Sequence, residues 1–129
     1  MIVADTDVLI DFLRGSGPMA DRVALELRHG LATTVISAFE LWAGALGSPR
    51  KERAVETLLD ALAILPLGTE EARCAAGVRR DLETAGGPIG MADSLIAGIC
   101  LSRGAVLLTR NRGHFERVSG LKLSFKSKC

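Results

Sequence analysis

The feature that most constrains this chain is its opening stretch, where a short apolar run ends abruptly in acidic residues. Residues 2–4 are apolar and just long enough for a buried strand, and Asp5, Thr6 and Asp7 follow before apolar periodicity resumes. Two carboxylates therefore stand at the carboxyl end of a strand. In open α/β sheets, ligands bind outside that edge. We expect a ligand site there, completed by whatever other side chains reach the same edge.

The composition is that of an ordinary globular protein. The chain has 129 residues, 48% of them hydrophobic and 24% charged, and this length buries one core but not two. No stretch approaches the roughly 18 apolar residues of a membrane span, and the start lacks the basic segment and cleavage site of a secretory signal. These features predict a single domain over residues 1–129, located in the cytoplasm.

The cysteine content and the net charge each exclude little. Three cysteines, Cys74, Cys100 and Cys129, are an odd number with no C-x-x-C pair, which argues against a disulfide framework and a zinc site. We interpret Cys74 and Cys100 as small hydrophobic residues in or near the core. The net charge of +1 neither requires nor excludes a nucleic-acid partner.

Short apolar runs alternate with helical patterns along the whole chain. The patterns predict strands over 2–4, 31–35, 64–67 and 105–108, with a possible edge strand over 121–125 before a basic tail. They predict helices over 7–14, 18–29, 38–46, 49–62, 69–85 and 91–102, the last apolar enough to lie in the core. Alternating strands and helices predict an α/β fold with a mostly parallel sheet covered on both faces.

Several oxygen-bearing side chains occupy strand exits or helix starts. Besides Asp5 and Asp7, Glu40 lies near the start of the helix over 38–46, Asp93 starts the core helix, and Asn111 follows the strand over 105–108. Carboxylates gathered at one sheet edge repel one another unless they are protonated or neutralised by a cation. A hard divalent ion such as Mg²⁺ or Mn²⁺ prefers oxygen ligands. Such a site suits phosphodiester hydrolysis.

Some of these residues also have a purely structural interpretation. Glu40 follows Ser37 by three residues and fits a capping box, and Asp93 is a favourable anion at a helix N-terminus. Asp11 is expected on a solvated helix face. Asp5 is harder to explain locally, because a charge that ends a buried strand needs a partner. We therefore favour a functional role for Asp5.

Four motifs together resemble one known family. They are Ile-Val-Ala-Asp-Thr-Asp-Val-Leu-Ile at 2–10, Ser-Ala-Phe-Glu-Leu at 37–41, Met-Ala-Asp-Ser-Leu-Ile-Ala at 91–97, and Leu-Leu-Thr-Arg-Asn at 107–111 with Phe115 after it. In order and spacing they resemble a PIN domain, most closely the VapC-type toxin of bacterial and archaeal toxin–antitoxin pairs. The resemblance implies a three-layer α/β/α fold and a metal-dependent endoribonuclease that cleaves RNA. It also implies a homodimer and a small VapB-like antitoxin that holds the enzyme inactive.

The resemblance also implies roles for individual residues. Asp5, Glu40 and Asp93 become the catalytic acids that bind Mg²⁺ or Mn²⁺, with Asn111 and Asp7 as possible further ligands. The supporting or substrate-binding positions are Thr6, Thr109, Arg110 and Arg112.

The chain departs from the family pattern at two positions. Asp7 stands where many relatives have Asn, and His114 stands where many have an acid before the Phe. Asn111 still offers an oxygen to a cation, but it brings no charge. We hypothesise that Asp7 restores the missing negative charge from the opposite side of the site.

Two other protein classes also carry acids after a first strand. A haloacid-dehalogenase-like phosphatase needs a later Lys and a paired acidic motif, yet no Lys lies between Lys51 and Lys122. A receiver-like signalling module, which is not catalytic, needs an acceptor Asp after its middle strand and a Lys after a late one. Residues 65–68 read Leu-Pro-Leu-Gly, and Thr109 and Arg110 occupy the later place. Both alternatives lack residues that their chemistry requires.

Overall fold

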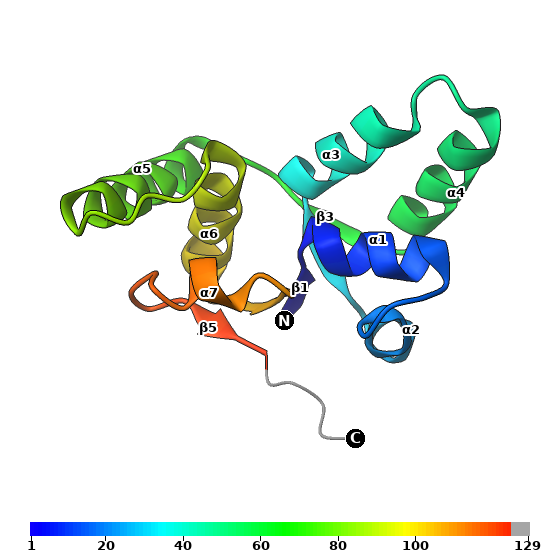
Figure 1. Cartoon of the computed structure of the whole chain (residues 1–129), viewed down its shortest axis with the longest axis horizontal. Coiled ribbons are helices and arrows are strands. Elements are labelled where there is room, and N and C mark those ends of the chain that lie inside the picture. The colour runs from blue at the N-terminus through cyan, green and yellow to red at the C-terminus, as the bar shows by residue number, and fades with distance from the viewer. Residues whose placement is uncertain (125–129) are drawn as a thin grey trace.

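The computed structural model describes residues 1–124, in which five strands form one sheet (Figure 1). The strands are β1 (Ile2–Ala4), β2 (Ala32–Thr34), β3 (Ala63–Leu65), β4 (Val106–Leu108) and β5 (Lys122–Leu123). They lie in the order β3-β2-β1-β4-β5, and every neighbouring pair is parallel. This confirms the predicted α/β fold. The order differs from the 2-1-3-4-5 order of flavodoxin-like and receiver folds.

Seven helices cover the two faces of the sheet in the described residues (Figure 1). They are α1 (Thr6–Arg14), α2 (Ala20–Leu27), α3 (Val35–Ala45), α4 (Pro49–Asp60), α5 (Thr69–Thr84), α6 (Met91–Arg103) and α7 (Arg112–Phe115). Val3 and Leu107 pack into one core with α5, α6 and α7, whereas Ala4 and Leu108 pack into a second core with α1 to α4. Alternate strand residues point to opposite faces, so this distribution gives three layers, as the resemblance implies.

Helix α6 is the central helix of its layer, as predicted from its apolar composition. Ile96, Ala97, Ile99 and Cys100 are at most 1% exposed. Gly98 lets α5 approach closely, because a Cβ at this position would lie 2.5 Å from the backbone nitrogen of Ala75. The first turn of α6 carries Asp93, so this packing fixes the position of a predicted site residue.

The start of α3 differs from the prediction. Thr34 is the N-cap, and its Oγ1 accepts a hydrogen bond of 3.1 Å from the backbone N–H of Ser37. The prediction of Ser37 as the cap, with Glu40 as its capping-box partner, was therefore wrong. Thr34 ends β2 and caps α3 at once, which leaves no loop between the two elements. Thr34 and Ser37 both carry a hydroxyl that could cap this helix, and Thr34 does so because β2 ends at this residue.

Other boundaries shift by a few residues. Asp5 rather than Thr6 is the N-cap of α1, and α2 starts at Ala20 rather than at Pro18. Strand β3 ends at Leu65, since Pro66 has no N–H for the ladder. The predicted edge strand over 121–125 is present as β5, while position 125 and the basic tail lie outside the described residues. Among the described helices, none combines the length and apolar character needed to cross a bilayer.

Candidate active site

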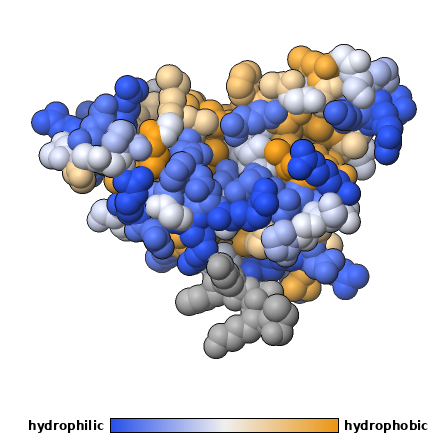
Figure 2. Space-filling model, in the orientation of Figure 1, coloured by the Kyte–Doolittle hydropathy of each residue, from blue (hydrophilic) through white to orange (hydrophobic). Residues whose placement is uncertain are grey.

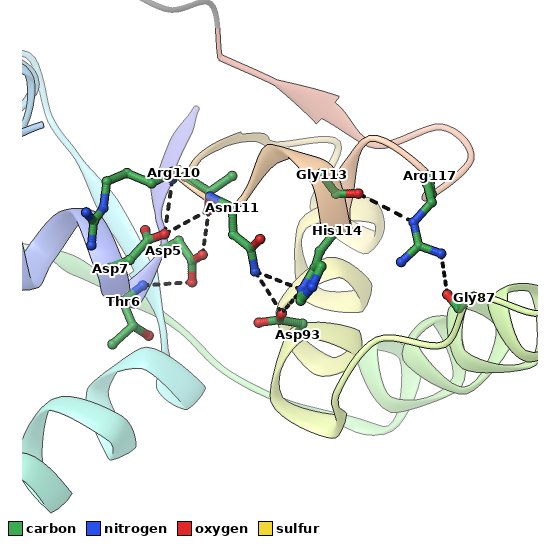
Figure 3. A network of polar contacts seen from close by, with 11 residues as sticks. Asp5, Thr6, Asp7, Gly87, Asp93, Arg110, Asn111, Gly113, His114 and Arg117 are labelled. Carbon is green, nitrogen blue, oxygen red and sulfur yellow. Dashed lines mark hydrogen bonds and ion pairs between the residues drawn. The ribbon is translucent and has the colours of Figure 1, made fainter. Parts of the chain in front are cut away.

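The register of β1 with β4 brings Asp5 and Thr109 together. The sheet order reverses direction between these two strands, and Ala4 pairs with Leu108. The residues that follow are therefore neighbours, and Thr109 Oγ1 donates a hydrogen bond of 2.7 Å to Asp5 Oδ2. The backbone N–H of Thr6 donates to Asp5 Oδ1 at 2.8 Å (Figure 3). Both carboxylate oxygens of Asp5 are thus held in place at the point where ligands bind in such sheets.

The environment of Asp5 disfavours its negative charge. The residue is 5% exposed, and burial is the main cause that raises its pKa to about 7. The charge of Asp7 raises the pKa further, and Asp93 adds a smaller effect in the same direction. Hydrogen bonds from Thr109 and Thr6 oppose these effects without cancelling them. A cation next to Asp5 would let it ionise fully at neutral pH.

Asp7 has one oxygen without a partner. Its Oδ2 accepts a hydrogen bond of 3.1 Å from the backbone N–H of Arg110 and lies 3.4 Å from Thr109 Oγ1 (Figure 3). Its Oδ1 is buried and has no hydrogen-bond partner among residues 1–124. Burial raises the pKa of Asp7, and Arg110 partly opposes this. A buried oxygen left unpaired in this way is costly unless a ligand satisfies it.

Arg110 is held beside Asp7 by a second, deeply buried acid. Its Nε lies 3.4 Å from Asp11 Oδ2, and Asp11 is only 5% exposed. The loop after α1 closes over Asp11, and a Cβ at Gly17 would come within 2.8 Å of the Asp11 carboxyl carbon. The prediction of Asp11 on a solvated face was wrong, because this loop covers that face. The side chain of Arg110 stays 44% exposed, so its charge faces the acidic edge and the solvent.

Glu40 reaches the acidic edge through Thr6. Its Oε1 lies 2.6 Å from Thr6 Oγ1, which also lies 2.8 Å from Ser37 Oγ. A hydroxyl has one proton, so Thr6 donates to the carboxylate and accepts from Ser37. Sequence reasoning treated Ser37 only as a cap. Its spacing of three residues from Glu40 on one helix face was the signal that the two side chains could share a partner.

Asp93 lies on the other side of Asp5, next to α7. Its Oδ2 is 3.1 Å from His114 Nδ1 and 3.5 Å from Asn111 Nδ2 (Figure 3). The backbone N–H of Asn111 donates to Thr109 Oγ1 at 2.9 Å. Thr109 therefore connects the group around Asp93 with Asp5. The predicted residue Asn111 lies between the two acids.

Two arginines near the site have structural partners. Arg112 donates to the backbone oxygen of Ser124 beside β5, so of the four predicted supporting residues it is the one that lies away from the acidic edge. Arg117, which the sequence also offers as a possible phosphate contact, donates to the backbone oxygens of Gly87 and Gly113 (Figure 3). These bonds hold α7 against the loop that precedes α6.

The donor set fits a hard divalent cation, although its acids are not yet gathered around one point. Within residues 1–124, no three Asp, Glu, His or Cys side chains are grouped tightly enough to hold one ion. Mg²⁺ in proteins uses one or two carboxylates and keeps several waters, so a tight trio is not required. The unpaired Oδ1 of Asp7 and the disfavoured charge of Asp5 are both features that a cation would satisfy.

A parallel sheet with acidic side chains near the point where the strand order reverses defines an α/β protein with an acidic edge. The profile of the PIN domain matches residues 2–121, and the chain belongs to the PIN domain family.

Two curated relatives of this chain are named as nucleases, and a solved VapBC structure shares its fold. The tRNA(fMet)-specific endonuclease VapC of Shigella flexneri is 30% identical over 122 residues, covering 92% of each chain. Ribonuclease VapC10 of Mycobacterium tuberculosis is 34% identical over 126 residues, covering 97% of this chain and 93% of the relative. The structure of VapBC-1 from nontypeable Haemophilus influenzae matches with a TM-score of 0.83 at 30% identity, over 99% of this chain and 100% of that one.

Proposed function

We propose that this protein is an endoribonuclease toxin that depends on Mg²⁺ or Mn²⁺ and is neutralised by a small antitoxin. The observation that carries the proposal is Asp5, a carboxylate at the reversal point of the sheet whose pKa is raised to about 7, mainly by burial and further by the charges of Asp7 and Asp93. The activities of two relatives, a tRNA(fMet)-specific endonuclease and a ribonuclease, support the choice of RNA as substrate. Such an activity belongs in the cytoplasm, as the sequence predicts.

The proposed chemistry divides among the residues at the acidic edge. Asp5, Asp93 and Glu40 would hold the divalent ion, with Asn111 as an uncharged oxygen donor. When bound, the ion supplies charge stabilisation at the phosphate and lowers the pKa of a bound water. Thr109 and Thr6 orient the carboxylates of Asp5 and Glu40 through the hydrogen bonds described above.

Arg110 has the position of a phosphate-binding side chain. Its guanidinium is partly exposed beside the acids. Asp11 pairs with its Nε at 3.4 Å, and the exposed part of the guanidinium could meet a phosphate oxygen. The guanidinium of an arginine can donate two parallel hydrogen bonds to one phosphate, which would orient the scissile bond. We therefore propose Arg110 as the substrate-orienting residue of the site.

A purified-protein assay tests the nuclease proposal. Asp5→Asn and Asp93→Asn should lower the cleavage rate by at least about 100-fold, because each removes a charge that is needed to bind the ion. Asp81→Asn is the matched control, since Asp81 is exposed on α5. The substrates are initiator tRNA and an elongator tRNA of similar length, with EDTA and then Mg²⁺ added back. Unchanged cleavage by Asp5→Asn in a preparation free of other nucleases would overturn the proposal.

A groove between α1, α3 and α4 suits a segment of the antitoxin. Its volume is about 540 Å³, and it extends to Glu40. Its floor and rim combine apolar and basic side chains, among them Ile10, Leu13, Leu41, Val55, Arg14, Arg50 and Lys51. A partner segment with apolar residues flanked by acidic ones would complement it. Leu13→Glu, at a partly exposed position of the groove, should therefore reduce copurification of the coexpressed antitoxin; undiminished copurification would contradict this assignment.

An apolar surface on α3 supports the predicted homodimer. Val35, Phe39 and Leu46 are 39%, 70% and 69% exposed, and Met91 at the start of α6 is 68% exposed. Figure 2 shows apolar surface along the upper margin of the molecule, over α3. We propose that a second copy covers this surface. Light scattering should show a dimer for the wild type and a monomer for Phe39→Glu. Leu25→Glu, on the exposed side of α2, is the control and should leave the dimer intact. A wild type that is monomeric at micromolar concentration would contradict the proposal.

A further inference from the structure

Three polar side chains from different parts of the chain converge in front of the first turn of α6. Asp93 Oδ2 and His114 Nδ1 are 3.1 Å apart, Asn111 Nδ2 and His114 Nδ1 are 2.8 Å apart, and Asn111 Nδ2 and Asp93 Oδ2 are 3.5 Å apart (Figure 3). Each atom of this trio is thus a close neighbour of both others. The side chains of His114 and Asp93 remain 49% and 24% exposed, so small ligands can reach them.

The trio is held rigidly by groups that do not belong to it. Phe115 is fully buried in the core next to His114, and Arg117 ties α7 to the loop before α6 through Gly87 and Gly113. The backbone of Asn111 is fixed by its N–H on Thr109. The packed fold therefore places the backbone segments from which the three side chains converge.

The separations within the trio match adjacent ligands of one ion. Donors next to each other around an octahedral ion at about 2.1 Å stand about 3 Å apart. The three observed separations, 2.8, 3.1 and 3.5 Å, lie on both sides of that value. The two ends of the Asn111 amide are assigned only from hydrogen bonding, so turning it presents Oδ1 at the same place.

With the Asn111 amide turned, one proton links the trio. The Nδ1–H of His114 then donates to Asp93 Oδ2 at 3.1 Å and faces Asn111 Oδ1 at 2.8 Å. A metal ion in place of this proton would meet a lone pair from each of the three side chains.

We propose that His114 is itself a metal ligand and that, with Asp93 and Asn111, it shifts the ion preference of this site from Mg²⁺ toward Co²⁺ and Mn²⁺. The proposal rests on the proposed function, which places Asp93 among the metal ligands. Imidazole nitrogen binds first-row transition ions well, whereas Mg²⁺ strongly prefers oxygen. The trio also carries one negative charge where an acid at position 114 would give two, which weakens Mg²⁺ binding further.

Electron spin-echo spectroscopy of the Mn²⁺-loaded protein without a histidine tag tests the ligand directly. A nitrogen bound to Mn²⁺ gives a ¹⁴N modulation, which should be present in the wild type and absent in His114→Ala. The matched control is His29→Ala, since the chain has two histidines and His29 is exposed at the end of α2 with its ring on the Leu25 carbonyl. This variant should keep the modulation. Absence of the modulation in the wild type, or its persistence in His114→Ala, overturns the proposal.

Calorimetric titrations with Co²⁺ and Mg²⁺ test the predicted selectivity. His114→Ala should lower Co²⁺ affinity at least about tenfold, and His114→Asp should raise Mg²⁺ affinity by a similar factor, so the Co²⁺ to Mg²⁺ affinity ratio falls in both. An unchanged ratio in both variants contradicts the proposal. If the protein cleaves RNA with Mg²⁺ but the Mn²⁺-loaded protein shows no ¹⁴N modulation, this inference is overturned and the nuclease proposal stands. Absence of both divalent-ion binding and cleavage would overturn both.

Discussion

Gly98 lies at a close approach between α5 and α6. Its substitution by Ala tests the packing that places Asp93. A Cβ at Gly98 would lie 2.5, 2.6 and 2.7 Å from the nitrogen, Cβ and Cα of Ala75. Ordinary contacts begin near 3.4 Å, so the two helices must separate by almost an ångström. Two of the three atoms belong to the backbone, so no side-chain rotation relieves the contact.

The expected cost follows from two opposing effects. Overpacking a core costs about 1–3 kcal/mol, and a contact with backbone belongs at the upper end of that range. Ala is a better helix former than Gly by about 1 kcal/mol, which offsets part of the cost. The free energy of unfolding of Gly98→Ala should therefore fall by about 1–2 kcal/mol. For a domain of this size, the Tm falls by roughly 4–8 °C.

Gly77→Ala is the matched control, because it makes the same substitution inside α5 with the opposite expected sign. Nothing lies within 4 Å of a Cβ at Gly77, so only the helix preference acts and stability should rise by up to about 1 kcal/mol. Urea unfolding followed by circular dichroism measures both variants. Because α6 carries Asp93 five residues before Gly98, Gly98→Ala should also weaken divalent-ion binding. A Gly98→Ala protein as stable as the wild type would refute the close approach of α5 and α6.

Three further predictions concern charged and thiol groups. Because the pKa of Asp5 is raised to about 7, the protonated side chain stabilises the metal-free protein in acid, and this stabilisation is lost as the pH rises from about 4 to about 7. In EDTA, the gain in Tm produced by Asp5→Asn should therefore be larger at pH 8 than at pH 5. An equal gain at both pH values would contradict the prediction. Burial raises the pKa of the Cys100 thiol to about 12, so peptide mapping after iodoacetamide treatment of the native protein should find the half-buried Cys74 modified well before Cys100. In a double-mutant cycle, Asp11→Asn and Arg110→Gln should show a coupling of about 0.5–1 kcal/mol, the lower range reflecting the exposure of the arginine; additive effects would mean that the pair does not form in solution.

The parts of the fold that depend on local patterns were predictable from the sequence. The apolar run before Asp5 identifies β1, and the run over 105–108 identifies β4. Since parallel strands share a carboxyl edge, the strand ends alone indicated that Asp5 and Asn111 lie at the same edge of the sheet. The apolar composition of 91–102 likewise indicated a core helix with Asp93 in its first turn.

The parts that depend on distant contacts were not predictable. Asp11 looks like a surface acid because α1 alone leaves it on an outer face. It is buried because the loop around Gly17 folds back over it and because Arg110, 99 positions later, supplies its counter-charge. The capping-box interpretation of Glu40 was wrong for a related reason, since a capping box is a local explanation and the actual partner of Glu40, Thr6, comes from another helix.

The placement of Asp7 bears on whether it compensates for the acid that is missing at position 114. Asp7 lies with Asp5 and Arg110, whereas His114 lies with Asp93 on the other side of Thr109, so the two halves of the site differ in charge. The charge of Asp7 acts on Asp5, whose pKa it raises, and Arg110 offsets only part of it. If Asp7 compensates, Asp7→Asn should weaken Mg²⁺ binding, and adding His114→Asp should restore it, because the total negative charge returns to its original value. Unchanged Mg²⁺ affinity in Asp7→Asn would show that the charge of Asp7 is neutralised locally and that the site functions with fewer effective charges than its relatives.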